Sequence, residues 1–225
     1  MGTPTTDANG TTQLVSMPHA TGDAMYFIPT AGAITQIPLM VYYHGHANND
    51  KKLHTSILEY IAALAVRDFR PLLKTKKCAL IEPFGGTYSK FGAPATAAGL
   101  AALIDAALGK TTRPGSLILA GFSGGGDALA AVGLNLSGPL FAQLSEVWCL
   151  DCMYSGEGKK WGDWARRNNK RLRVGLSTGE NSRPGRGPRA QKDAIGTGGT
   201  ITIETVDCGH EELPGICLQN WLGTP

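Results

Sequence analysis

One segment, residues 116–130, constrains the fold more than any other part of this chain. It starts with an apolar run at residues 117–120, continues as Gly-Phe-Ser-Gly-Gly at 121–125, and ends in a stretch rich in alanine and leucine. The apolar run is typical of a buried strand and the last part of a helix, so the glycines mark a sharp turn between them. Such a turn holds its central residue, Ser123, in a strained conformation, with the hydroxyl exposed at the carboxyl end of the strand. The N-terminus of the following helix favours negative charge beside that hydroxyl.

The rest of the chain alternates between strand and helix patterns. Strands are expected at residues 13–17, 24–28, 38–43, 78–81, 116–120, 147–150, 173–177 and 201–206. Helices are expected at residues 53–66, 95–108, 124–134, 159–169, 188–194 and 213–222. This order predicts an α/β protein: a mostly parallel, twisted sheet with helices on both faces and two short antiparallel strands at the N-terminus. A length of 225 residues suits a single domain, in which residues 1–11 are expected to be flexible.

Composition and charge argue against several classes of partner. The net charge is only +3, and the most basic stretch, residues 170–189, is interrupted by glycine and proline and lacks aromatic stacking partners. It is therefore expected to be a solvated loop and not a nucleic-acid face. No run approaches the ~18 apolar residues of a membrane span. Residues 1–10 lack the basic start and apolar stretch of a signal peptide, which predicts a cytoplasmic protein unless a signal has been removed.

The cysteines do not indicate a disulfide scaffold. There are five, an odd number at low density: Cys78, Cys149, Cys152, Cys208 and Cys217. Cys149 and Cys152 have a C-x-x-C spacing, but they lie at the end of a predicted strand, where residues three apart point to opposite faces. We therefore expect buried structural thiols and neither a zinc site nor a redox pair.

A serine hydroxyl needs a base, and the base needs an acid. Among the histidines only His210 follows Ser123 in the chain, and it lies just after the last predicted strand, at the same edge of the sheet. Two carboxylates compete to orient it. Asp151 ends the strand at 147–150 in apolar surroundings, whereas Glu180 follows the strand at 173–177 in a stretch typical of a solvated turn. A buried Asp151 would need a partner such as His210, so Asp151 is favoured and Glu180 is the alternative.

Backbone amides are expected to receive the negative charge of an acyl-transfer intermediate. One should belong to Gly124, directly after Ser123, and the other to His46, in the His-Gly-His sequence that follows the predicted strand at 38–43. His44 and His46 could instead form a metal pair, but no cysteine or carboxylate cluster accompanies them. The sequence therefore predicts neither a metal nor a dissociable cofactor.

Four aromatic residues are candidate substrate contacts, with core packing as the alternative for each. Tyr88 and Phe91 follow the predicted strand at 78–81 and so open onto the same edge as Ser123. Tyr154 lies three residues after Asp151, and Trp161 shares one face of a predicted helix with Trp164.

Taken together, the His-Gly pair at 44–45, the Gly-x-Ser-x-Gly at 121–125 and His210 resemble the α/β-hydrolase superfamily, over residues 38–222. The segment at 150–155, Leu-Asp-Cys-Met-Tyr-Ser, with Trp161 and His210 downstream, is similar to a group of small serine hydrolases in which the Asp-x-x-Tyr segment lies beside the triad. The resemblance implies a serine esterase that works through an acyl-enzyme.

The chain leaves little room for a cap domain, so an open cleft would suit small or polymeric esters. A peptidase or amidase with the same triad, and a non-catalytic binding protein of this fold, are the alternatives. The sequence does not indicate an oligomeric state.

Overall fold

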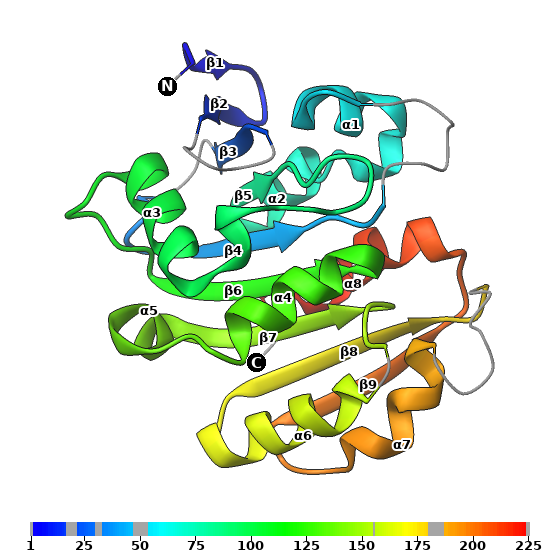
Figure 1. The fold of residues 1–225 in the computed structure, drawn as a ribbon. Helices are drawn as coiled ribbons and strands as arrows, with labels where there is room; N and C mark the ends of the chain where they lie inside the picture. The colour runs from blue at the N-terminus through cyan, green and yellow to red at the C-terminus, as the bar shows by residue number, and fades with distance from the viewer. Residues whose placement is uncertain are drawn as a thin grey trace.

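The computed structural model describes residues 2–16, 22–29, 33–46, 54–154, 156–179 and 187–223. Within these residues, nine strands form one sheet in the order β1-β2-β3-β5-β4-β6-β7-β8-β9 (Figure 1). Their bounds are β1 Thr5–Thr6, β2 Gly10–Val15, β3 Ala24–Pro29, β4 Pro38–Tyr43, β5 Ala79–Pro83, β6 Ser116–Phe122, β7 Leu144–Leu150, β8 Arg171–Ser177 and β9 Ile201–Val206. The pairs β1–β2, β2–β3 and β3–β5 are antiparallel, and all others are parallel.

Helices cover both faces of this sheet. Their bounds are α1 Ile57–Ala63, α2 Arg70–Lys76, α3 Ala97–Leu108, α4 Gly126–Gly133, α5 Gly138–Gln143, α6 Glu157–Asn168, α7 Lys192–Ile195 and α8 Leu213–Trp221. One core cluster joins the sheet to α3, α4, α6 and α7, and the other joins it to α1, α2 and α8. None of the helices in the described part of the chain is both long and apolar enough to cross a membrane.

Alternating side chains of the central strands supply the two cores. In β4, Leu39, Val41 and Tyr43 belong to one cluster, while Met40 and Tyr42 belong to the other. Successive side chains of a strand point to opposite faces, so a strand covered on both sides must be apolar throughout. This is why the central strands appear in the sequence as continuous apolar runs.

The expected α/β class is confirmed, with differences at the N-terminus and in two helices. Thr5–Thr6 pairs with residues 11–12 of β2 as a short edge strand that was not predicted, a position that suits β-branched threonines. The helices α2 and α5 were not predicted from the sequence. Leu73 is the one buried residue of α2, and α5 has none, so neither carries a clear apolar stripe.

The sheet topology creates a crevice above β6. From β4 the chain moves to one side to form β5 and then to the other side to form β6. At such a switch point the loops after neighbouring parallel strands diverge, and ligands of open α/β sheets bind in the gap. The loops after β4, β5 and β6 meet there, at the carboxyl edge of the sheet.

Candidate active site

The turn after β6 places Ser123 at the base of the crevice. Residues Ser123–Gly125 form a single 3₁₀ turn, η3, which leads directly into α4. Ser123 has a φ of +48°, in the left-handed region, which costs a non-glycine residue about 1–2 kcal/mol. The turn can be this tight because Gly125 has no side chain: a Cβ there would lie 2.1 Å from the Tyr43 carbonyl oxygen. The strained turn that the sequence predicts is therefore present.

His210 and Asp151 meet beside this turn. His210 begins the 3₁₀ turn η5 (His210–Glu212) after β9, and Asp151 directly follows β7. The distance between His210 Nδ1 and Asp151 Oδ2 is 2.9 Å; Asp151 is fully buried and the His210 side chain is 27% exposed. The ring of Phe122, the residue before Ser123, lies 4.5 Å from the imidazole, measured between centroids. The base and acid expected from the sequence are thus neighbours of the expected nucleophile.

Asp151 is held by more partners than the sequence suggests. It has a left-handed φ of +45°. Its carboxylate accepts hydrogen bonds from the Ser177 backbone N–H, at 3.0 Å, and from the Ser177 hydroxyl. The Tyr154 hydroxyl donates to the Asp151 carbonyl oxygen at 3.1 Å. The alternative acid, Glu180, lies outside the described residues.

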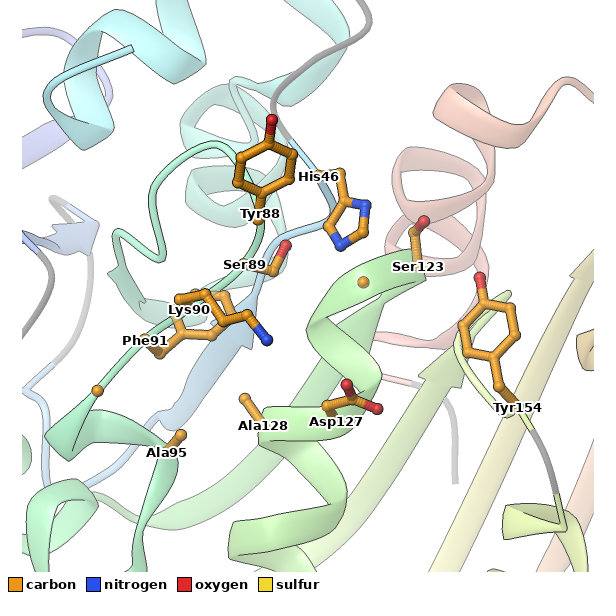
Figure 2. A pocket seen from close by; sticks show the side chains of 12 residues that line it. His46, Tyr88, Ser89, Lys90, Phe91, Ala95, Ser123, Asp127, Ala128 and Tyr154 are labelled. Atoms are coloured by element: carbon orange, nitrogen blue, oxygen red, sulfur yellow. The ribbon is translucent and has the colours of Figure 1, made fainter. Parts of the chain in front are cut away.

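A cleft of about 930 Å³ opens beside Ser123 (Figure 2). Its lining consists of His46, Tyr88, Ser89, Lys90, Phe91, Gly92, Ala95, Ser123, Gly124, Asp127, Ala128 and Tyr154. Tyr88 is 62% exposed at the rim, whereas Phe91 is buried and packs edge-on against Tyr43. Three of the four aromatic candidates, Tyr88, Phe91 and Tyr154, therefore line the cleft.

The fourth candidate, Trp161, does not reach the cleft. Its side chain is 1% exposed and packs edge-on against Trp164, with ring centroids 5.4 Å apart. A Cβ added to Gly133 of α4 would lie 2.7 Å from the Trp161 ring, so the indole fills the space under that helix. The expectation of a substrate contact is wrong here, since helical spacing alone does not distinguish a core face from a face that lines a site.

His46 and Gly124 both line the cleft beside Ser123. In Figure 2 the His46 ring stands between Tyr88 and Ser123. A Cβ at Gly124 would come within 2.2 Å of that ring, so a side chain at this position would displace the His46 ring. His46 has no carboxylate partner among the described residues. This distinguishes it from His210.

His44 is a structural residue of the β4 loop. It is fully buried, its Nε2 accepts a hydrogen bond from the Gly85 N–H at 2.9 Å, and its Nδ1 lies 2.6 Å from the Gly45 carbonyl oxygen. Burial lowers the pKa of His44 to about 4, so the ring is neutral. Both nitrogens are engaged, which leaves none for a metal. Across the described ranges, no group of three or more His, Cys, Asp or Glu side chains could hold a metal ion.

The cysteines are free, and all are buried as expected except Cys208, which is partly exposed. The orientation of one pair differs from the expectation. The Cys149 and Cys152 side chains belong to the same core cluster and do not point to opposite faces. The rule of alternating sides fails because β7 ends at Leu150 and the chain turns at Asp151.

Comparisons with known proteins identify the fold. No protein-family model and no curated protein matches the chain. A novel cold-adapted esterase from an Arctic intertidal metagenomic library has a similar structure, with a TM-score of 0.60 and 16% identity over 97% of this chain and 93% of that one. Est1E from Butyrivibrio proteoclasticus matches with a TM-score of 0.55 and 12% identity, over 94% and 97%. Poly(aspartic acid) hydrolase-1 from Sphingomonas sp. KT-1 matches with a TM-score of 0.55 and 11% identity, over 95% and 98%.

Proposed function

We propose that this chain, which has the α/β-hydrolase fold, hydrolyses carboxylic esters with Ser123 as the nucleophile. The observation that carries the proposal is the 2.9 Å contact between His210 Nδ1 and the buried Asp151 carboxylate, beside a serine with a left-handed backbone. A buried carboxylate on one imidazole nitrogen leaves the other nitrogen free to act as a general base. A binding protein has no need of such an arrangement.

The reaction follows from these roles. The Ser123 hydroxyl oxygen attacks the ester carbonyl carbon while His210 Nε2 takes the hydroxyl proton. The amides of Gly124 and His46 receive the negative charge on the former carbonyl oxygen. His210 then gives its proton to the leaving alcohol, and the acyl group stays on Ser123 as an ester. A water molecule, deprotonated by His210, releases the acid by the same steps in reverse.

The size and lining of the cleft suit substrates of different sizes. Its volume of about 930 Å³ is near the upper end of ordinary ligand pockets. Lys90 and Asp127 bring one charge of each sign to its walls, and Tyr88 offers an exposed ring at the rim. These features favour bulky or polymeric esters as well as small ones. The likeness to a poly(aspartic acid) hydrolase makes amide hydrolysis the second candidate.

The nucleophile is tested with p-nitrophenyl acetate and butyrate, a panel of polyesters and a panel of amides. Ser123→Ala should lower ester turnover by several orders of magnitude and leave the circular dichroism spectrum unchanged, because it removes only the attacking hydroxyl. Ser145→Ala is the matched control, since the Ser145 hydroxyl donates to the Leu117 carbonyl at the opposite end of the sheet. Wild-type turnover should survive EDTA, since no step is assigned to a metal.

A fluorophosphonate probe identifies the reactive serine directly. Mass spectrometry should find the adduct on Ser123 and not on Ser89, the other serine of the cleft. His210→Ala should abolish labelling, whereas His46→Ala should retain it, because no carboxylate in the described part of the chain orients the His46 ring. Labelling of Ser89, or full turnover by Ser123→Ala, contradicts the proposal.

A further inference from the structure

At the end of β8, the hydrogen bonding of the sheet continues through the side chain of Asp151, the residue after β7. Leu150 is paired with Gly175, and the Asp151 N–H donates to the Gly175 carbonyl oxygen at 2.9 Å. In a regular parallel ladder the next bond would run from the Ser177 N–H to the Asp151 carbonyl oxygen. The chain turns away at Asp151, where φ is +45°, and the Ser177 N–H donates to Asp151 Oδ1 instead, at 3.0 Å. The carboxylate thus takes the place of a backbone carbonyl.

The Ser177 side chain adds a second bond to the same carboxylate. Its hydroxyl donates to Asp151 Oδ2, the oxygen that also faces His210 Nδ1. Both Ser177 and Asp151 are fully buried, so water does not compete for these bonds. Two donors from one residue therefore fix both oxygens of the carboxylate, and with them its orientation toward the imidazole.

Arg189 holds Ser177 from the other side. It lies in the 3₁₀ turn η4 (Pro188–Gln191), and its Nε donates to the Ser177 carbonyl oxygen at 2.9 Å. Its Nη2 donates to the same oxygen. Hydrogen bonds from a charged donor are about twice as strong as neutral ones, so this pair anchors the last residue of β8 to a separate segment of the chain.

We infer that Ser177 is a positioning residue for the reaction: it aims the Asp151 carboxylate at His210 and limits how much of the carboxylate charge the imidazole receives, with Arg189 supporting it. The inference rests on the proposed function, because Ser177 acts only through Asp151 and His210. Without the hydroxyl, Oδ2 loses one of its two donors and interacts more strongly with the imidazolium. The pKa of His210 should then rise, since a nearby negative charge that is less satisfied elsewhere favours the protonated ring.

Other titratable and charged groups surround the pair and must be considered in reading that pKa. They are Tyr154 after β7, Arg189 on η4, Cys208 after β9, Glu211 and Glu212 on η5, and Cys217 on α8. Burial raises the pKa of both cysteines and the Asp151 charge adds to the rise, so they stay neutral near pH 7. None of these groups is altered by a change at Ser177.

Ser177→Ala tests the inference, because it removes the hydroxyl and keeps the backbone N–H. We expect kcat/KM to fall by about 10- to 100-fold, the effect of losing one hydrogen bond to a charged group. The acidic limb of the pH profile of kcat/KM should move upward by at least about 0.5 pH units. Proton NMR should show the His210 ring titrating at the higher pH and its Nδ1–H resonance displaced. Ser145→Ala should change none of these quantities.

Arg189→Gln provides a second variant at an exposed position, with Lys192→Gln on α7 as its charge-matched control. Arg189→Gln should shift the His210 resonance in the same direction by less, and Lys192→Gln should leave it in place. The NMR titration needs no turnover, so it remains decisive even if Ser123→Ala proves fully active and the proposed function fails. An unchanged His210 pKa in Ser177→Ala, whether activity falls or not, overturns the positioning role.

Discussion

The two sides of Ser123 are built differently. On one side, Asp151 and His210 are held by hydrogen bonds from the ends of β7 and β8 and lie in buried or half-buried positions. On the other side, the cleft is lined by loop side chains such as Tyr88 and Lys90, which are exposed to solvent. The strand ends therefore impose one arrangement on the acid and base, whereas the exposed side chains of the cleft have fewer contacts that fix them. Substitutions on the two sides should therefore differ in size and in kind.

The largest effect is expected for Asp151→Asn. The amide can hold the wrong imidazole tautomer, so kcat should fall by about 10⁴-fold with the fold intact. Steady-state kinetics on a p-nitrophenyl ester measure this. Glu180→Gln is the matched control and should retain most activity. An equal loss of kcat in the two variants would contradict the assignment of Asp151, and not Glu180, as the acid that orients His210.

An intermediate effect is expected from His44, which supports the backbone of the cleft side. Its pKa is about 4 in the folded protein because of burial, below the ~6.5 of an unfolded chain. The unfolded state therefore binds the proton first, so stability is fully present above pH 6.5 and is lost as the pH falls toward 4. The loss should reach about 3 kcal/mol in the free energy of unfolding.

Urea unfolding between pH 7.5 and 4.5 measures this loss, and comparison with His44→Gln isolates it. The variant has no titrating ring, so its stability should fall less steeply over that range. Parallel curves for the two proteins would show that His44 does not carry the effect.

The smallest effect is expected for Tyr88→Ala at the rim of the cleft. Loss of one exposed ring should raise KM by about 2- to 10-fold and leave kcat nearly unchanged, the pattern of a substrate contact outside the reacting centre. Leu58→Ala removes an exposed apolar side chain of α1 and should change neither constant. A fall in kcat comparable to that of Asp151→Asn would contradict the division into two sides.

The positions of the acid and base could be predicted from the sequence, because apolar runs identify the strands and the residues that follow them. The apolar run before Ser123 identifies β6, and His210 and Asp151 follow other strands at the same edge of the sheet. Glycine spacing in a sharp turn predicts the strained serine, which the φ of +48° bears out. The bounds of β4 and β9 also agree with the structure, since both are short runs with clear ends.

The contacts that hold the acid and base in place could not be predicted from the sequence. Ser177 and Arg189 belong to no motif, because their role depends on a carboxylate replacing one bond of the ladder. His44 appears in the sequence as a possible metal ligand, and only its burial and the Gly85 N–H reveal a structural residue. Trp161 illustrates the same limit: a helical stripe predicts that a face is covered, but not what covers it.

The backbones of Ser123 and Asp151 have a consequence for engineering this chain. Both adopt left-handed φ values at which glycine would relax the backbone, so a search for more heat-resistant variants by local geometry would include these two positions. Each glycine would remove a side chain to which the proposed mechanism assigns a role. Thermal tolerance must therefore be raised elsewhere, for example at Lys77 or Asn169, which have the same conformation at helix ends far from the cleft.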